Sequence, residues 1–222
     1  MPPKKKPVLP VTGDPEADQL LVDDPLARLL GMLLDQQVPM EWAFGSPRVL
    51  RQRLGGTLDA ARIATMPIEE LEAMFKGPPA LHRYPGSMAK RTQQLCQHLV
   101  DEYGGRADAL WSGAATGPEL FARLKALPGF GVEKAKIFLA LLAKRFDVAP
   151  PGWEEAALPF SDELKRSVAD IDSAQALAEV RAFKQRKKLD GKLDPDAPLP
   201  KPKAPRVPKG LLTSDTKDDS AT

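Results

Sequence analysis

The sequence predicts an all-helical protein. Its apolar residues recur mainly at intervals of three and four, as on one face of an α-helix, and alternating strand-like patterns are hard to find. Prolines and glycines interrupt these stretches and divide the chain into many short helices. A chain of 222 residues is long enough for one substantial domain, and two separate cores are not required.

The clearest helix start is Asp24-Pro25, where a capping carboxylate precedes a proline in the first helical position. Five leucines at helical spacing then predict a buried helix that ends near Val38-Pro39. The segment 147–160 contains three prolines and a glycine, so we expect a loop there. The other expected helices cover residues 40–54 (interrupted at Pro47), 57–63, 67–75, 87–103, 108–113, 117–126, 132–146 and 172–188.

The two ends of the chain differ in composition from the middle. Residues 1–13 and 190–222 are rich in proline and lysine and lack apolar periodicity, so they cannot bury enough surface to offset chain entropy. We therefore expect one helical domain over residues 14–189, between two disordered basic tails. From Lys184 onward ten lysines and arginines stand against six aspartates, so the formal charge of +2 conceals a mildly acidic body. Such tails either supply local positive charge for nucleic acid or simply aid solubility.

Several classes of protein are disfavoured. No apolar run approaches the roughly 18 residues that span a membrane, and no secretory signal follows the first lysines. We expect a cytoplasmic protein, at the nucleoid if the source is bacterial, and a monomer. Cys96 is the single cysteine and His82 and His98 are the only histidines, which argues against a disulfide, a thiolate cluster or a histidine-rich metal site. We expect no structural metal and no cofactor, although carboxylates alone are able to hold magnesium or calcium.

The most informative motif is the short link Leu127-Pro128-Gly129-Phe130-Gly131 between two predicted helices. Gly129 and Gly131 can adopt backbone angles closed to other residues, and they place no side chain between the turn and an approaching surface. The N–H groups of the turn and of the next helix then point outward together. Because the helix dipole adds positive potential there, the arrangement suits a phosphate.

Charged side chains follow this link. Lys134 and Lys136 add positive charge for a phosphate, and Glu133 opposes them. Phosphate contacts of this kind fix the register of a protein on DNA and carry no sequence information. Taken alone, the link is equally compatible with a purely structural turn between helices. The surrounding residues are therefore needed to distinguish a phosphate-binding hairpin from a structural turn.

Residues 127–142 resemble the helix-hairpin-helix (HhH-GPD) superfamily of base-excision DNA glycosylases, which includes endonuclease III and the alkyladenine glycosylases. Its signature is Leu-Pro-Gly-X-Gly followed by an apolar helix. Residues 30–38 look like the family's early helix, whose Gln-containing end approaches the DNA and the base pocket. Residues 87–91 look like the Lys-containing helix start that precedes the hairpin. Order and spacing agree over about residues 24–160, and the resemblance implies an all-helical, two-lobed fold with a DNA cleft between the lobes.

The resemblance also implies roles for individual residues. Gln36 and Gln37 would hydrogen-bond a flipped base or fill the gap it leaves, or they are a polar helix end. Trp153 would stack on an unpaired base, or it packs a loop onto the core. His82 and Tyr84, in the loop before residue 87, are further candidates for DNA contact. The residues expected to contact the DNA backbone are Leu127, Pro128, Gly129, Phe130, Gly131, Lys134, Lys136, Lys90 and Arg91.

The chain departs from the family pattern in its chemistry. Bifunctional members place a nucleophilic lysine at the second position after the last hairpin glycine, which is Glu133 here. Lys134 comes one residue later, and a rotation of about 100° on the helix turns its amine away from the pocket. A lyase mechanism through a Schiff base is therefore disfavoured. The family's iron–sulfur cluster needs four cysteines, so this chain resembles a short branch that lacks the cluster.

A second departure concerns the catalytic carboxylate. Catalytic members carry an Asp roughly twenty to two dozen residues past the hairpin, which stabilises the cationic sugar as the glycosidic bond breaks. Residues 150–155 contain no Asp. Glu154 or Glu155 would supply the carboxylate with one more methylene, unless both belong to a solvated acidic loop. Asp147 comes too early.

Three hypotheses follow. The first, which we favour, is a monofunctional DNA glycosylase that binds double-stranded DNA with a damaged or mismatched base and hydrolyses its N-glycosidic bond. The second is a DNA-binding or lesion-sensing relative that has lost the catalytic Asp. The third is a helical protein-interaction module in which the Pro-Gly link is structural.

Overall fold

The computed structural model describes residues 7–189 and 204–213. In these residues the chain is all-helical and contains no β-strand, which confirms the predicted fold class. The elements are α1 (Pro15–Asp23), α2 (Pro25–Leu34), α3 (Met40–Arg53), α4 (Ala60–Thr65), α5 (Ile68–Lys76), α6 (Pro85–Tyr103), α7 (Ala109–Ser112), α8 (Gly117–Ala126), α9 (Val132–Phe146), α10 (Trp153–Ala157), the 3-10 turn η1 (Val168–Asp170) and α11 (Ala174–Leu189).

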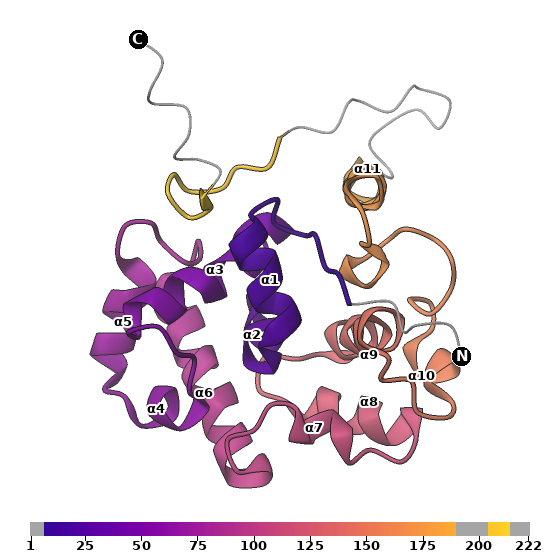
Figure 1. Cartoon of the computed structure of the whole chain (residues 1–222), viewed down its shortest axis with the longest axis horizontal. Helices are drawn as coiled ribbons and strands as arrows, with labels where there is room; N and C mark the ends of the chain where they lie inside the picture. Colours follow the sequence, from indigo (N-terminus) through magenta and orange to yellow (C-terminus); the bar gives the residue numbers. More distant parts are fainter. Residues whose placement is uncertain (1–6, 190–203, 214–222) are drawn as a thin grey trace.

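Helix α2 lies in the middle of the molecule (Figure 1). Helices α3 to α6 lie on one side of it, where α4 and α5 pack on α6. Helices α7 to α10 lie on the other side with η1 and α11, where α9 packs on α8, α10 and η1. Nine of the ten residues of α2 are buried, as expected for a helix that is apolar on every face. Both groups of helices therefore share one continuous core.

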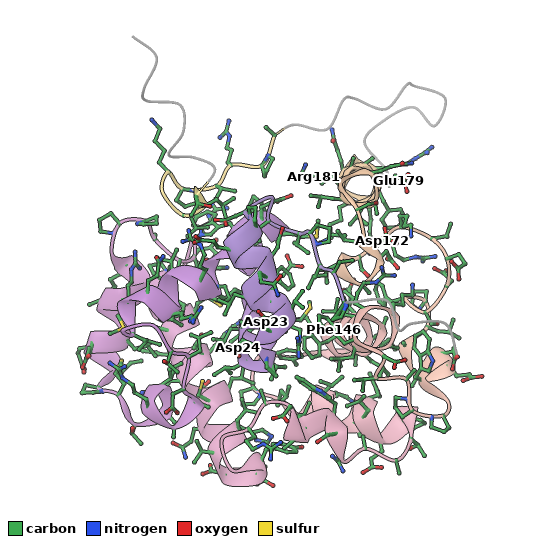
Figure 2. The ribbon with its side chains drawn as sticks, viewed as in Figure 1. Asp23, Asp24, Phe146, Asp172, Glu179 and Arg181 are labelled. Carbon is green, nitrogen blue, oxygen red and sulfur yellow. The ribbon has the colours of Figure 1, made fainter. Side chains whose placement is uncertain are left out.

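A buried arginine ties α2 to its surroundings. The guanidinium of Arg28 donates hydrogen bonds to the carbonyls of Leu21 (3.0 Å) and Val22 (2.7 Å), near the end of α1. Its centre lies 4.1 Å from the centroid of the Phe146 ring, at the end of α9, whose position relative to α1 and α2 is visible in Figure 2. Burial lowers the pKa of Arg28 to about 10, so its charge remains at neutral pH. The hydrogen bonds and the ring contact of Arg28 together join α1, α2 and α9.

Helix starts follow the local sequence closely. The side chain of Asp24 caps α2 by accepting from the N–H groups of Leu26 and Ala27, and Pro25 is its first residue. Asp14-Pro15 repeats this arrangement at α1, a helix that sequence analysis did not predict. Because the same Asp-Pro pair begins α1 and α2, the sequence already contained the signal for the start of α1.

Several boundaries differ from the expected ones. Helix α2 ends at Leu34 rather than near residue 38, because Asp35 already leaves the helical conformation and Gln37 has a left-handed φ of 58°. Helix α3 runs without interruption through Pro47. The predicted loop 147–160 contains α10, which is stabilised by packing against α8 and α9.

The prediction of disordered tails is wrong for the described parts of both tails. Leu9 and Val11 are buried in the core, and so are Leu211 and Leu212. Composition averaged over a window hides such short apolar pairs among prolines and lysines. Residues 1–6, 190–203 and 214–222 lie outside the described part of the chain.

The segment 204–213 packs against α3 and the start of α1. The guanidinium of Arg48 donates to the carbonyl of Leu211 at 2.7 Å, and the N–H of Thr213 donates to the Asp14 carboxylate at 2.6 Å. At Gly45 an added Cβ would lie 2.6 Å from Leu212 Cδ2, so the glycine makes room for this side chain. The C-terminal segment is thus part of the folded structure.

None of the helices in the described residues has the length and apolar character needed to cross a membrane.

We predict that Leu211→Ala lowers the free energy of unfolding by about 2 kcal/mol, because it removes buried apolar surface and leaves a cavity. Urea denaturation measures the change. Leu164→Ala, at an exposed leucine, is the control and should change stability by less than about 0.5 kcal/mol. Equal stability of both variants would mean that the C-terminal segment contributes nothing to the fold in solution.

Candidate nucleic-acid interface

The link between α8 and α9 is held by two apolar side chains. Leu127 and Phe130 are buried, and the Phe130 ring meets Phe138 of α9 edge-on at 6.0 Å between centroids. The Phe130 N–H donates to the Leu127 carbonyl at 3.0 Å, which closes the turn. Because these side chains point inward, the backbone of Gly129 and Gly131 is left at the surface.

The two glycines of the link serve different purposes. Gly129 has a φ of +82°, and an added Cβ would lie 2.4 Å from Leu33 Cδ1 of α2. Both the backbone angle and the close approach therefore require glycine. Gly131 has a φ of −99°, which any residue adopts, so the expectation of an unusual angle is wrong there. An added Cβ at Gly131 would meet nothing within 4 Å.

The first turn of α9 is open to an external partner. Among the described residues no side chain caps its N-terminal N–H groups, in contrast to α1, α2, α4 and α8, where Asp or Thr oxygens do so. Val132, its first residue, is about half exposed. Unpaired N–H donors and the positive end of the dipole lie together at this surface, which is the arrangement that binds an anion.

Beside this surface lies a polar group of residues at the C-terminal end of α2. It forms where α2 ends, α6 begins and α9 begins. We call it the α2-end cluster, and it consists of Asp35, Gln36, Gln37, His82, Tyr84, Arg91 and Lys134.

Hydrogen bonds between distant parts of the chain hold the cluster together. Arg91 of α6 donates to Gln36 Oε1 at 2.6 Å. The ammonium of Lys134 donates to the Leu33 carbonyl at 2.5 Å. The Tyr84 hydroxyl donates a longer bond, 3.4 Å, to Gln37 Oε1. The structure thus brings together the hairpin, Lys134, Arg91 and both glutamines, which sequence analysis placed in one site.

His82 fixes the backbone at Gln36. Its Nδ1 accepts a hydrogen bond from the Tyr84 N–H at 3.0 Å. The proton must then lie on Nε2, which donates to the Gln36 carbonyl at 3.0 Å. Burial lowers the pKa of His82 below its ordinary value, although the bond to the Gln36 carbonyl opposes this shift. The neutral ring therefore fixes the backbone at Gln36, the residue before the exposed Gln37.

Gln37 itself is exposed and has a left-handed backbone. This conformation is unfavourable for a residue with a Cβ, by about 1 kcal/mol or more. The neighbouring contacts of Gln36 and the ring of His82 hold the turn in place. The result is an exposed amide side chain presented on a rigid base.

From its position one residue after Glu133, we expected the side chain of Lys134 to point away from the base pocket. In the structure it points toward the α2-end cluster. Its ammonium reaches across to the end of α2. Burial lowers its pKa to about 8, Asp35 raises it, and Arg91 lowers it. Rotation on a helix determines the direction of Cβ, and the four-carbon side chain then bridges the remaining distance.

The other predicted cations lie at the edges of this surface. Lys90 is mostly exposed, with its ammonium 3.8 Å from a Glu72 carboxylate oxygen. Lys136 donates to the Leu158 carbonyl at 2.8 Å, which ties the segment after α10 to the first turn of α9. The carboxylate of Glu133 lies 3.9 Å from Lys187 of α11.

The carboxylates proposed from sequence lie outside the cluster. Glu154 and Glu155 are exposed on α10, a helix that packs on α8 and α9. Within the described residues, no hydrogen bond or ion pair joins their side chains to the α2-end cluster. Trp153 is half-buried against the core, and its backbone is so close to Gly117 that an added Cβ there would lie 2.4 Å from Trp153 Cα. The contacts of Trp153 are those of a packing residue.

The ion pairs that α11 forms with other helices were not predicted from the sequence. Its cations contact three acidic residues at the ends of other helices. Arg181, labelled in Figure 2, lies 2.5 Å from the buried Glu41 carboxylate of α3. Lys184 lies 3.4 Å from Asp35. The Lys- and Arg-rich end of α11 was visible in the sequence, but its partners were not.

Gln37 and Tyr84 are the exposed members of the α2-end cluster, whereas His82 is buried. An open cavity of about 740 Å³ lies elsewhere, between α1, the end of α3 and the start of α4, and none of its lining residues belongs to the cluster or the hairpin. In residues 7–189 and 204–213, no three His, Cys, Asp or Glu side chains are placed to hold a metal ion together.

Comparison of the sequence with models of known protein families gives no match, and comparison with curated proteins gives no relative.

We predict that His82 makes the fold sensitive to acid. Its pKa is lowered in the folded protein, whereas the unfolded chain has the ordinary value of about 6.5. Stability is therefore fully present above about pH 6.5 and falls as the pH decreases below it, because the unfolded chain binds the proton more readily. Urea unfolding at pH 7.5 and pH 5.5 measures the loss. His82→Asn, which does not titrate, should show a smaller loss, and an identical loss would contradict the prediction.

Proposed function

We propose that this protein binds duplex DNA through residues 127–131 and the first turn of α9, and that it hydrolyses the N-glycosidic bond of an altered base. The observation that carries the DNA-binding part is Gly131. Within the described residues, neither its backbone angle nor any neighbouring atom requires a glycine there. A glycine at this exposed position leaves room for a surface that approaches from outside, such as a DNA backbone.

The arrangement of the helices supports a phosphate at this point. The open N–H groups of α9 start beside Lys134, and Arg91, the residue after the exposed Lys90, bonds Gln36 within the α2-end cluster. We further propose that the helices on the two sides of α2 correspond to the two lobes of the HhH-GPD glycosylases. The cluster then lies in the DNA cleft, with Gln37 at its exposed edge.

The cluster supports a role in base extrusion. The amide of Gln37 can donate and accept hydrogen bonds, and it stands exposed on a rigid turn. It would fill the space that a flipped base leaves, while Gln36 and Tyr84 meet the base or its partner. Extrusion costs a few kcal/mol and is easiest for damaged or mismatched pairs, so an altered base is the substrate class.

Hydrolysis by water is the chemistry that the residues favour. The ammonium of Lys134 is engaged with the Leu33 carbonyl, which argues against attack on the sugar. Glu154 and Glu155 remain the carboxylates that the family resemblance suggests for stabilising the sugar cation. Their separation from the cluster favours the alternative of a DNA-binding protein without catalysis, which would bind the same duplexes and release no base.

We predict that Gly131→Asp weakens duplex binding at least about tenfold in low salt, because a side chain and a negative charge enter the phosphate site. Fluorescence anisotropy with a labelled duplex measures the affinity. Thr57→Asp adds the same charge at an exposed position lining the cavity near α4, and it should change affinity less than about twofold. If wild type does not bind duplex at low salt, the proposal fails and the interaction-module hypothesis stands.

Catalysis is tested by single-turnover base release from duplexes that carry uracil, alkylated purines, oxidised bases or mismatches. We expect wild type to release one of these bases. Glu154→Gln and Glu155→Gln test the carboxylates that the resemblance suggests, with duplex binding measured in parallel. Binding without release from any duplex would establish the non-catalytic alternative.

A further inference from the structure

Asp35 occupies an unusual position. It is the C-terminal cap of α2, and its N–H donates to the Gly31 carbonyl at 3.0 Å. A carboxylate at the negative end of a helix dipole is electrostatically unfavourable. Nothing in the capping geometry uses the Asp35 side chain, so the local structure does not explain why a carboxylate stands there.

The surroundings of Asp35 partly compensate for this position. Its side chain is only 13% exposed, and Oδ2 lies 3.4 Å from the Lys184 ammonium of α11. Lys134, on the other side of the α2 end, is close enough for Asp35 to raise its pKa. Within the described residues no hydrogen bond engages Oδ1. The carboxylate is therefore held in place by positive charge and keeps an unused oxygen.

The other acidic residues around the cluster are arranged differently. Glu41 is buried and receives both a 2.6 Å hydrogen bond and a 2.5 Å contact from Arg181. Glu133 is mostly exposed and faces Lys187. Asp35 is thus the mostly buried carboxylate that lies directly beside Gln36 and Gln37 in the chain.

We propose that Asp35 is the carboxylate that stabilises the sugar cation during base release. This inference rests on the proposed glycosylase function and replaces Glu154 and Glu155 in that role. As the C1′–N bond breaks, the base leaves with the bonding electron pair, and positive charge develops on C1′ and the ring oxygen. A fixed negative charge beside the sugar lowers the energy of that state. Water then adds to C1′, and its released proton balances the charge of the departing base.

Lys184 has a separate part in this scheme. It is partly exposed near the end of α11, and its single contact to Asp35 is long. When a duplex binds, its ammonium exchanges the carboxylate for a DNA phosphate, as polyanions displace weak ion pairs. Asp35 is then left facing the extruded nucleotide. Lys184 therefore contributes to affinity and is not needed for the chemical step.

This difference provides a matched pair of variants. Asp35→Asn removes the charge and keeps the shape of the side chain, whereas Lys184→Ala removes the ion pair and keeps the carboxylate. The assay is single-turnover release from the duplex of the lesion panel that wild type processes fastest. We expect Asp35→Asn to slow release at least about 100-fold with duplex affinity changed less than about threefold. Lys184→Ala should weaken duplex affinity, and Asp35→Glu should release the base at a rate between those of wild type and Asp35→Asn. Asp101→Asn, at an exposed aspartate of α6, is the control and should change release less than about twofold.

The outcomes separate the two levels of the proposal. Normal release by Asp35→Asn, or loss of release in Glu154→Gln or Glu155→Gln alone, overturns the role of Asp35 and leaves the glycosylase function intact. If Asp35→Asn and Lys184→Ala slow base release equally and both lower the thermal stability, the ion pair has a structural role. That result also overturns the catalytic role of Asp35. No release by wild type from any duplex overturns the glycosylase function itself, and the role of Asp35 with it.

Discussion

Helix α2 is buried along nearly its whole length, and its position between two groups of helices brings the parts of the candidate site together. Residues far apart in the chain meet because they all pack against this helix: Gly129 approaches Leu33, Lys134 binds the Leu33 carbonyl, and Arg28 reaches α1 and α9. Helix α2 stops abruptly at Leu34, and the chain turns at Gln37, which has a left-handed backbone. Polar residues gather at that abrupt end, where the hairpin and the start of α6 also lie.

The ends of helices supply most of the chemistry at this surface. The uncapped start of α9 provides N–H donors, and the end of α2 provides carbonyls that Lys134 and His82 satisfy. The N–H donors and cations at this surface are a local feature of a body whose net charge is slightly negative. Helix α11 adds to them, because its cations neutralise Glu41, Asp35 and Glu133 around the same surface.

Local signals in the sequence identified much of this arrangement, and contacts between distant residues account for the rest. The hairpin, Gln36, Gln37 and Arg91 were found because each belongs to a short motif. The pair of Asp35 and Lys184 was not found, since 149 residues separate them and no local pattern links a helix cap to the far end of the chain. Lys134 was misplaced because helical rotation says little about where a long side chain ends. Leu211 and Leu212 were missed because composition was averaged over a tail.

The docking of Thr213 against Asp14 means that the last described residues complete a contact with the first helix. A chain made from its amino end can form this contact only after residue 213 has been synthesised. Products that stop after α11 would lack it, and they would leave Arg48 and the space beside Gly45 uncovered. Folding of α1 and α3 during synthesis would therefore precede the step that covers them with residues 204–213.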